Sequence, residues 1–281
     1  MMTKYQINGT IIVGLSFLAI TGISLLHART SSPLDTKTSA PIGDKTNASE
    51  LAAKPTIVLV HGAFADATGW QHLIPLLERD GYDVIAVQNP LSSFAADVET
   101  TKRLIDAQQG AVVVVGHSYG GAVITEAAAG NANVKALVYL SAFAPEAGEP
   151  IGAFGDKYPA PPLNATLKPD AALFLYIDRA QLRDVFAKDV SPTEASVMAA
   201  TQKPLNKSVF TAAPSAAAWK TIPSWYVVAQ EDRAINPDLE RFYAKRMGAK
   251  TTELKSSHVS FISHPAEVTR LIEEAAGAAL K

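Results

Sequence analysis

The middle of the chain places a serine between glycines, in the sequence Gly116-His117-Ser118-Tyr119-Gly120-Gly121. This segment follows the apolar, β-branched run 112–115 and precedes a helix-prone stretch at 122–129. Between a strand and a helix, the pattern G-x-S-x-G holds the serine hydroxyl on a sharp turn above the end of a buried strand. Only glycine fits the crowded neighbouring positions of such a turn. We therefore interpret Ser118 as a nucleophile and not as an incidental serine in a glycine-rich turn.

A serine hydroxyl becomes a good nucleophile only when a nearby base removes its proton, and that base is normally a histidine. On this type of fold the chain order is serine, acid, histidine. After Ser118 only His258 and His264 remain as candidates. His258 directly follows a predicted strand, whereas His264 precedes Pro265 and is expected to open the last helix. We therefore predict His258 as the base.

The acid that orients the histidine is expected after the predicted strand 224–229. Asp232 stands there, beside Glu231, which is expected to point elsewhere. Asp238 resembles a first-turn helix charge. Asp232 is thus the predicted acid.

Stabilisation of an oxyanion needs two backbone N–H groups aimed at the developing charge. One is expected from Tyr119, just after the nucleophile. The other is expected from the loop His61-Gly62-Ala63-Phe64, most simply from Ala63. We interpret His61 as a buried support for this loop, and His72 and His117 as structural.

These residues need a scaffold that brings strand ends together. Apolar strand patterns at 56–60, 83–87, 111–115, 134–140, 224–229 and 251–255 alternate with helical patterns. This alternation predicts an α/β fold with a mainly parallel, doubly wound sheet. The candidate groups all follow strand ends, which meet at the carboxyl edge of such a sheet.

The alternation is interrupted at about 146–222, a proline-rich region without a convincing strand pattern. Short helical patterns at 169–176, 178–187 and 192–200 predict an inserted, mainly helical cap over the end of the sheet. Aromatic residues here and near the turn at Ser118 could line an apolar acyl pocket, but for those of the cap we expect packing in the core instead. The candidates are Phe64, Tyr119, Phe143, Phe174 and Tyr176.

Composition narrows the possible functions. The chain has 281 residues, 48% of them hydrophobic, and a formal net charge of −2, which suits one large domain with no nucleic-acid partner. It has no cysteine, which excludes disulfides, thiolate metal sites and a cysteine nucleophile. The predicted chemistry requires no metal or organic cofactor.

The first 28 residues resemble a secretory signal peptide, with Lys4, an apolar run from Ile11 to Leu26, and Ala28 at the expected cut. Leu26 fits a cleavage site poorly, so an uncleaved N-terminal membrane anchor is the alternative. Residues 29–54 are polar and predict a disordered linker, and the folded domain is expected over 55–281. The protein is expected to be exported, to the periplasm or outside the cell.

The motifs at 60–63, 116–121, 231–235 and 257–258 resemble the α/β-hydrolase superfamily, in particular plant-type methylesterases and hydroxynitrile lyases. The resemblance implies Ser118, Asp232 and His258 as a triad, with Ala63 and Tyr119 as oxyanion donors. It covers most of 56–278 and is loose in the cap.

Two positions distinguish the chemistries of that branch. Its lyases have a threonine where this chain has Gly62, and a lysine where it has Val259. The resemblance therefore implies a carboxylesterase-like serine hydrolase acting on a small ester through an acyl-enzyme. A lactonase, an amidase, a hydroxynitrile lyase-like enzyme and a non-catalytic ligand-binding relative are the alternatives.

Overall fold

The structure is a computed structural model that describes residues 54–280. The predicted signal peptide or anchor at 1–28 and all of the predicted linker except Lys54 lie outside the described residues. In residues 54–280, no helix is both long enough and apolar enough to cross a membrane.

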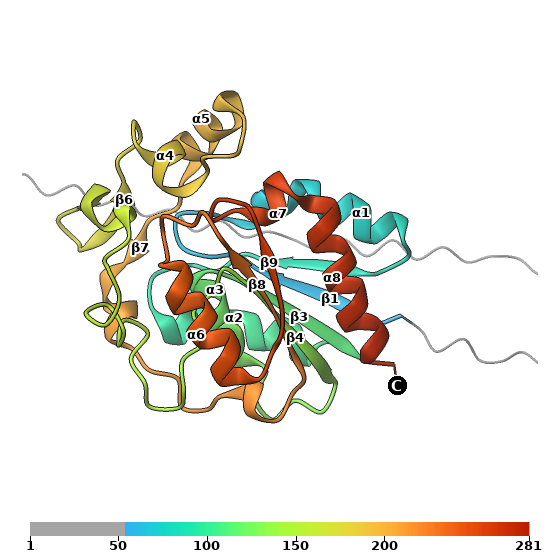
Figure 1. Cartoon of the computed structure of the whole chain (residues 1–281). Helices are drawn as coiled ribbons and strands as arrows, with labels where there is room; N and C mark the ends of the chain where they lie inside the picture. The colour runs from blue at the N-terminus through green and yellow to red at the C-terminus, as the bar shows by residue number, and fades with distance from the viewer. Residues whose placement is uncertain (1–53, 281) are drawn as a thin grey trace, which may run out of the picture. The chain divides into compact units, whose positions relative to one another are not determined.

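A six-stranded parallel sheet forms the centre of the fold, with strand order β2-β1-β3-β4-β8-β9 (Figure 1). Its strands are β1 (Thr56–Val60), β2 (Val84–Val87), β3 (Val112–His117), β4 (Val134–Leu140), β8 (Ser224–Ala229) and β9 (Lys250–Leu254). The strand β3 is buried along its whole length, as expected for a β-branched strand covered on both faces. Val60 pairs with Gly116, and Gly116 with Tyr139, so β1, β3 and β4 end at the same edge of the sheet.

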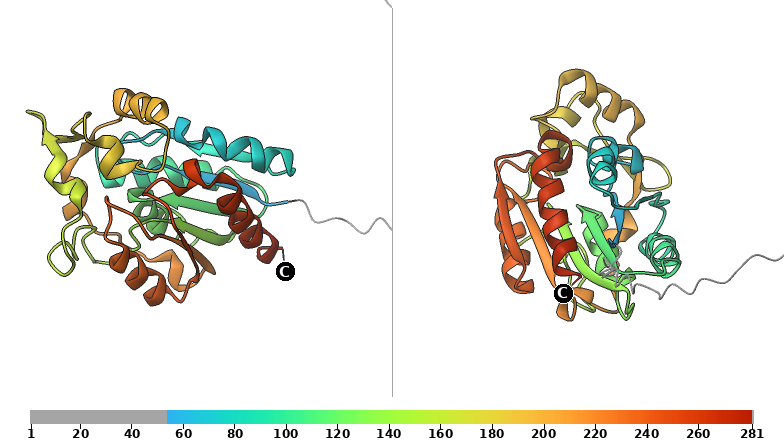
Figure 2. Two further views of the ribbon diagram at one scale, coloured as in Figure 1. Left: turned by 45° about the horizontal axis from the view of Figure 1, so that its top comes forward. Right: turned by 90° about the vertical axis from the view of Figure 1, so that its right-hand side faces the viewer.

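Helices cover both faces of the sheet. The helices α1 and α8 contact each other on one face, and α2 and α3 contact each other on the opposite face (Figures 1 and 2). Outside the insertion the helices are the 3₁₀ helix η1 (Ala67–His72), α1 (Ile74–Arg79), α2 (Phe94–Asp106), α3 (Tyr119–Ala127), α6 (Pro237–Met247), α7 (Ser260–Ser263) and α8 (Pro265–Ala278). The predicted doubly wound α/β architecture is confirmed.

A long insertion between β4 and β8 forms the cap. It contains the helices α4 (Leu182–Phe186) and α5 (Pro192–Thr201), the 3₁₀ helices η2 (Pro162–Thr166), η3 (Lys207–Thr211) and η4 (Ala218–Lys220), and the strands β5 (Leu167–Pro169), β6 (Phe174–Ile177) and β7 (Leu205–Asn206). These strands form a small antiparallel sheet in the order β5-β6-β7.

The cap sheet corrects the prediction that this region lacks strands, and in particular the helical pattern predicted for 169–176. The reason lies in the turn between β5 and β6. The Asp170 carboxylate accepts hydrogen bonds from the N–H groups of Ala172 and Phe174 at 2.9 Å each, and Leu173 adopts a left-handed φ of 66°. Aspartate favours such turns, and here the turn overrides the helical periodicity.

Candidate active site

Ser118 occupies the sharp turn between β3 and α3. Its backbone has φ 54° and ψ −123°, a conformation that side-chain-bearing residues rarely adopt. Three backbone hydrogen bonds hold the turn: Ser118 N–H donates to Leu140, and the Ser118 carbonyl accepts from Gly121 and Phe143, at 3.0–3.1 Å. A side chain at Gly120 would collide with the Val60 carbonyl, so glycine is required for α3 to pack against the end of β1. The sequence thus folds locally to present Ser118 beside the loop that follows β1.

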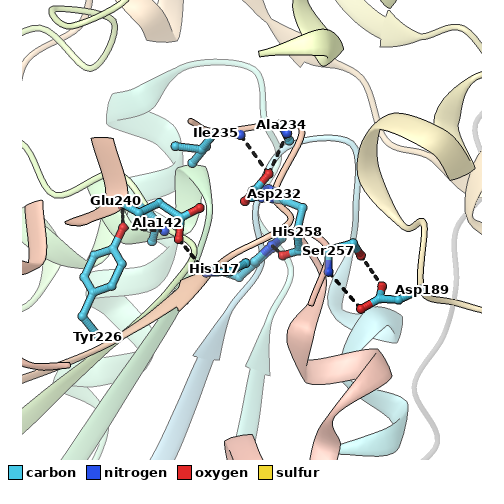
Figure 3. A network of polar contacts seen from close by, with 11 residues as sticks. His117, Ala142, Asp189, Tyr226, Asp232, Ala234, Ile235, Glu240, Ser257 and His258 are labelled. Atoms are coloured by element: carbon cyan, nitrogen blue, oxygen red, sulfur yellow. Dashed lines mark hydrogen bonds and ion pairs between the residues drawn. The ribbon is translucent and has the colours of Figure 1, made fainter. Parts of the chain in front are cut away.

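His258 and Asp232 form a buried pair next to this turn (Figure 3). The His258 Nδ1 atom lies 2.5 Å from Asp232 Oδ2, and both side chains are at most 1% exposed. The other Asp232 oxygen accepts hydrogen bonds from the N–H groups of Ala234 (2.6 Å) and Ile235 (2.9 Å). The loop after β8 therefore folds around the carboxylate and aims it at His258.

The other acids and the other histidine considered for these roles have different partners in the structure. Glu231 is exposed and lies 3.8 Å from Lys255, and Asp238 pairs with Arg241 on the surface of α6. His264 precedes α8 and contacts the Ser263 hydroxyl at 2.9 Å. Of these candidates, only Asp232 and His258 contact each other in the way the prediction requires.

Ser118 and His258 line the same cavity. The His258 Nε2 atom is buried and has no hydrogen-bond partner within residues 54–280, so no hydrogen bond joins it to Ser118 in this state. In ligand-free enzymes the hydrogen bond between nucleophile and base is often long and shortens when substrate binds.

The two predicted oxyanion donors also line this cavity. Neither the Ala63 N–H nor the Tyr119 N–H donates a hydrogen bond within the described part of the chain. Tyr119 is the first residue of α3, where the N–H has no intrahelical acceptor and the helix dipole favours negative charge. The Tyr119 hydroxyl is held elsewhere, donating to Asp97 at 2.7 Å.

Two buried histidines support these loops, as predicted. His61 Nδ1 contacts the Gly62 carbonyl at 2.8 Å, and its Nε2 accepts from the Asn89 N–H at 3.1 Å. Burial lowers the pKa of His61 to about 4, so the ring is neutral at pH 7. His117 Nε2 contacts the His258 carbonyl at 3.0 Å, and burial lowers its pKa as well. Both rings fix backbone that surrounds the candidate site.

The cavity has a volume of about 380 Å³ and lies between the sheet edge and the cap. Phe64 and Phe143 line it, and their role in binding substrate stays a prediction. Phe174 and Tyr176 do not; Leu175 does. This alternation follows from the strand geometry of β6, in which successive side chains point to opposite faces.

Most of the lining comes from cap residues that no sequence motif marked. Most of them are apolar, which is the only signal that could have indicated them, as with Ile151, Phe154, Leu163, Phe186, Leu205 and Phe210; Asn164 and Tyr158 are the polar exceptions in the cap lining. Asp, Glu, Lys and Arg are absent from the lining within residues 54–280. The candidate site therefore combines the polar side chains of Ser118 and His258 with a mainly apolar cavity.

Comparison with known proteins identifies the family of this chain. A model of the alpha/beta hydrolase family matches residues 57–271. Alpha/beta hydrolase nvfD from Aspergillus novofumigatus is 28% identical over 250 residues, covering 81% of this chain and 99% of that protein. Putative methylesterase 15 from Arabidopsis thaliana is 27% identical over 257 residues, covering 80% of this chain and 57% of that protein.

Two further matches lie in the branch named above. The α-hydroxynitrile lyase of Arabidopsis thaliana is 35% identical over 119 residues, which are 37% of this chain and 46% of the lyase. The crystal structure of polyneuridine aldehyde esterase superposes with a TM-score of 0.70 at 19% identity, covering 79% of this chain and 98% of that one. The chain belongs to the α/β-hydrolase family, and its resemblance to the methylesterase and hydroxynitrile lyase branch is confirmed.

Proposed function

We propose that this protein is a carboxylesterase-like serine hydrolase that works through an acyl-enzyme. The observation that carries the proposal is the buried His258–Asp232 pair: His258 lines the same cavity as Ser118, and its Nε2 has no hydrogen-bond partner within residues 54–280. In this proposal Ser118 is the nucleophile, His258 is the base and Asp232 orients His258. The N–H groups of Ala63 and Tyr119 form the oxyanion hole.

The reaction has two balanced steps. The Ser118 hydroxyl attacks the ester carbonyl while its proton passes to His258 Nε2, and the alcohol leaves with that proton. A water molecule then attacks the acyl-enzyme, gives its proton to His258, and releases the carboxylic acid as the serine proton is restored. The buried Asp232 carboxylate stabilises the imidazolium that forms in each step.

The cavity lining supports a neutral, apolar ester as substrate. A free carboxylate or ammonium group on the substrate would lose its hydration without meeting an opposite charge in the cavity, which is strongly unfavourable. Aliphatic or aromatic groups would instead bury apolar surface against the cap and gain about 25 cal/mol per Å². The expected preference is for uncharged esters with bulky apolar groups.

Two positions argue for hydrolysis over lyase chemistry. A Cβ atom at Gly62 would lie 2.7 Å from the Ser118 Cβ and 3.0 Å from His117 Nδ1, so the threonine of the related lyases has no room here. Val259 is apolar and 1% exposed, and it supplies no positive charge to hold cyanide. Lactone or amide hydrolysis would use the same groups.

We further propose that the enzyme acts outside the cytoplasm, on the basis of the signal-like sequence at residues 1–28. Expression of the full chain, followed by fractionation and N-terminal sequencing of the product, tests this proposal. A cut near Ala28 supports export with cleavage, and an intact N-terminus in the membrane fraction supports the anchor. An intact chain in the cytoplasm overturns export.

The activity is tested with matched esters, lactones, amides and cyanohydrins, using the wild type and Ser118→Ala. We expect turnover of neutral apolar esters, with kcat/KM at least a hundredfold higher than for the same acyl group bearing a free carboxylate. We expect Ser118→Ala to lose at least a thousandfold in kcat. Cyanohydrin cleavage without ester turnover would establish the lyase alternative, and ligand binding without turnover would establish the non-catalytic one.

A further inference from the structure

A second carboxyl group, Glu240 on α6, is buried beside the acid of the candidate site. Glu240 is 0% exposed, and its Oε2 atom accepts a hydrogen bond from the Ala229 N–H at 2.9 Å. Its Oε1 atom is buried and has no donor within residues 54–280. The Asp232 carboxyl is its neighbour (Figure 3), and a hydrogen bond between the two side chains contributes to the raised pKa of Glu240.

Two adjacent carboxylates cannot both be charged without a strong penalty in a site closed to water. The hydrogen bonds decide which one holds the proton. Asp232 receives two backbone N–H groups and the Nδ1 of His258, whereas Glu240 receives one backbone N–H. Asp232 is therefore the better stabilised as an anion, and Glu240 keeps the proton.

The groups around Glu240 do not change this assignment. Tyr226, on the adjacent β8, donates its hydroxyl hydrogen to the Ala142 carbonyl. Arg241 points its guanidinium to Glu253 and Asp238 on the surface. Burial, the charge of Asp232 and a hydrogen bond to Asp232 all raise the pKa of Glu240 well above its ordinary value, against smaller opposing effects of the Ala229 N–H and of Arg241.

We infer that Glu240 is a positioning residue that stays protonated and donates a hydrogen bond from Oε1 to the Asp232 carboxylate. In this bond the buried Oε1–H donates to the Asp232 carboxylate, which gives Oε1 a partner and adds a further restraint on Asp232 beside its bond to His258. It also withdraws negative charge from Asp232, which limits how strongly Asp232 stabilises the His258 imidazolium. The inference rests on the proposed triad.

Substitutions at Glu240 separate this role from simple support of the end of β8. Glu240→Gln keeps a neutral donor for Asp232 and an acceptor for Ala229, so kcat should stay within about twofold. Glu240→Leu removes the donor, so kcat should fall by about tenfold with KM unchanged, because Glu240 does not line the cavity. Asp238→Asn, an exposed acid on the same helix, is the matched control and should change neither.

The acid limb of the kcat/KM profile for 4-nitrophenyl butyrate provides a second readout, since it reports protonation of the essential base in the free enzyme. A residue that only supports the fold would not move this limb. Loss of the hydrogen bond leaves more charge on Asp232, so Glu240→Leu should raise this limb by about half a pH unit. Glu240→Gln should leave the limb in place. A fall of the limb in Glu240→Gln would mean that Glu240 is ionised in the wild type, and would overturn the inference.

Infrared spectroscopy of the resting enzyme tests the proton directly and needs no turnover. The difference spectrum between the wild type and Glu240→Gln at pH 7 should contain the carbonyl stretch of one protonated carboxylic acid. Its absence overturns the inference even if the ester is hydrolysed and Glu240→Leu fails to fold. A protein that shows the band but hydrolyses no ester would contradict the proposed function alone.

Discussion

Ser257, the residue before His258, is bonded twice to Asp189 of the cap. Its N–H donates to Asp189 Oδ2 at 2.9 Å, and its hydroxyl contacts the other carboxylate oxygen (Figure 3). Asp189 lies between α4 and α5, so the cap directly holds the loop that carries the predicted base. The cap therefore does more than enclose the cavity: it also restrains His258.

Removing one of these two bonds is expected to lower kcat. Asp189→Asn keeps one acceptor oxygen but cannot accept a hydrogen bond at its amide nitrogen, so the loop loses part of its restraint. We expect kcat to fall by about three- to tenfold and KM to change less than twofold, measured by steady-state ester hydrolysis. Asp156→Asn, at an exposed cap position, is the control and should behave as the wild type. A change confined to KM would show that Asp189 acts on the pocket instead.

A single methyl group at Gly62 is expected to disable the candidate site. The Gly62→Ala Cβ would lie 2.7 Å from the Ser118 Cβ and 3.0 Å from the His117 carbonyl oxygen, so either the turn at Ser118 or the loop after β1 must shift. A displacement of about 1 Å at reacting groups lowers kcat by about a hundredfold. Gly110→Ala, where a Cβ meets no atom within 4 Å, provides the matched control. Equal kcat in both variants would contradict the close approach.

Buried neutral His61 predicts acid sensitivity of the fold. The pKa of His61 is lowered to about 4 in the folded protein, mainly by burial, against 6.5 when unfolded. Below pH 6.5 the unfolded chain binds a proton that the folded chain does not, so the free energy of unfolding falls with pH until about 4. At 1.36 kcal/mol per pH unit this loss is about 3 kcal/mol.

Urea unfolding of the wild type and His61→Gln between pH 7 and 4 measures this loss. The variant should lose about 3 kcal/mol less over that range, whatever its stability at pH 7. Parallel curves would contradict the prediction, because they would show that His61 binds its proton equally well in the folded and the unfolded chain.

Glu240 predicts a pH dependence of the opposite sign. Its pKa is raised in the folded protein, so the stability it contributes is complete below the unfolded pKa near 4.5 and is lost as pH rises through the folded pKa. Glu240→Gln has no proton to lose. The free energy of unfolding of Glu240→Gln should therefore increase relative to that of the wild type, by up to about 1.4 kcal/mol for each pH unit above pH 4.5. Chemical denaturation at pH 4.5, 6 and 7.5 measures the difference, and a constant gap would contradict a neutral Glu240.

Much of the scaffold could be predicted from the sequence because each element carries its own local signal. The apolar runs of β1 and β3 and the glycines around Ser118 are contiguous patterns, and the structure places them as expected. The cap hairpin was missed because a single turn, centred on Asp170, decides it against a helical pattern.

The contacts of Asp232 with Glu240 and of Ser257 with Asp189 could not have been predicted. Glu240 looks like an ordinary acid in the first turn of a helix, and Asp189 like a surface charge of the cap. Their roles arise only when distant segments pack together and exclude water. Buried polar contacts of this kind depend on tertiary structure, which no local periodicity encodes.

The most direct test of the account is the identity of the residue that becomes covalently modified. The wild type and Ser118→Ala are treated with a fluorophosphonate, and the adduct is located by mass spectrometry of peptides. We predict one adduct per chain, on the peptide that contains Ser118, with loss of ester hydrolysis in proportion to labelling and no adduct in Ser118→Ala. Ester hydrolysis that persists in Ser118→Ala, or an adduct on another residue that abolishes turnover, would contradict the account.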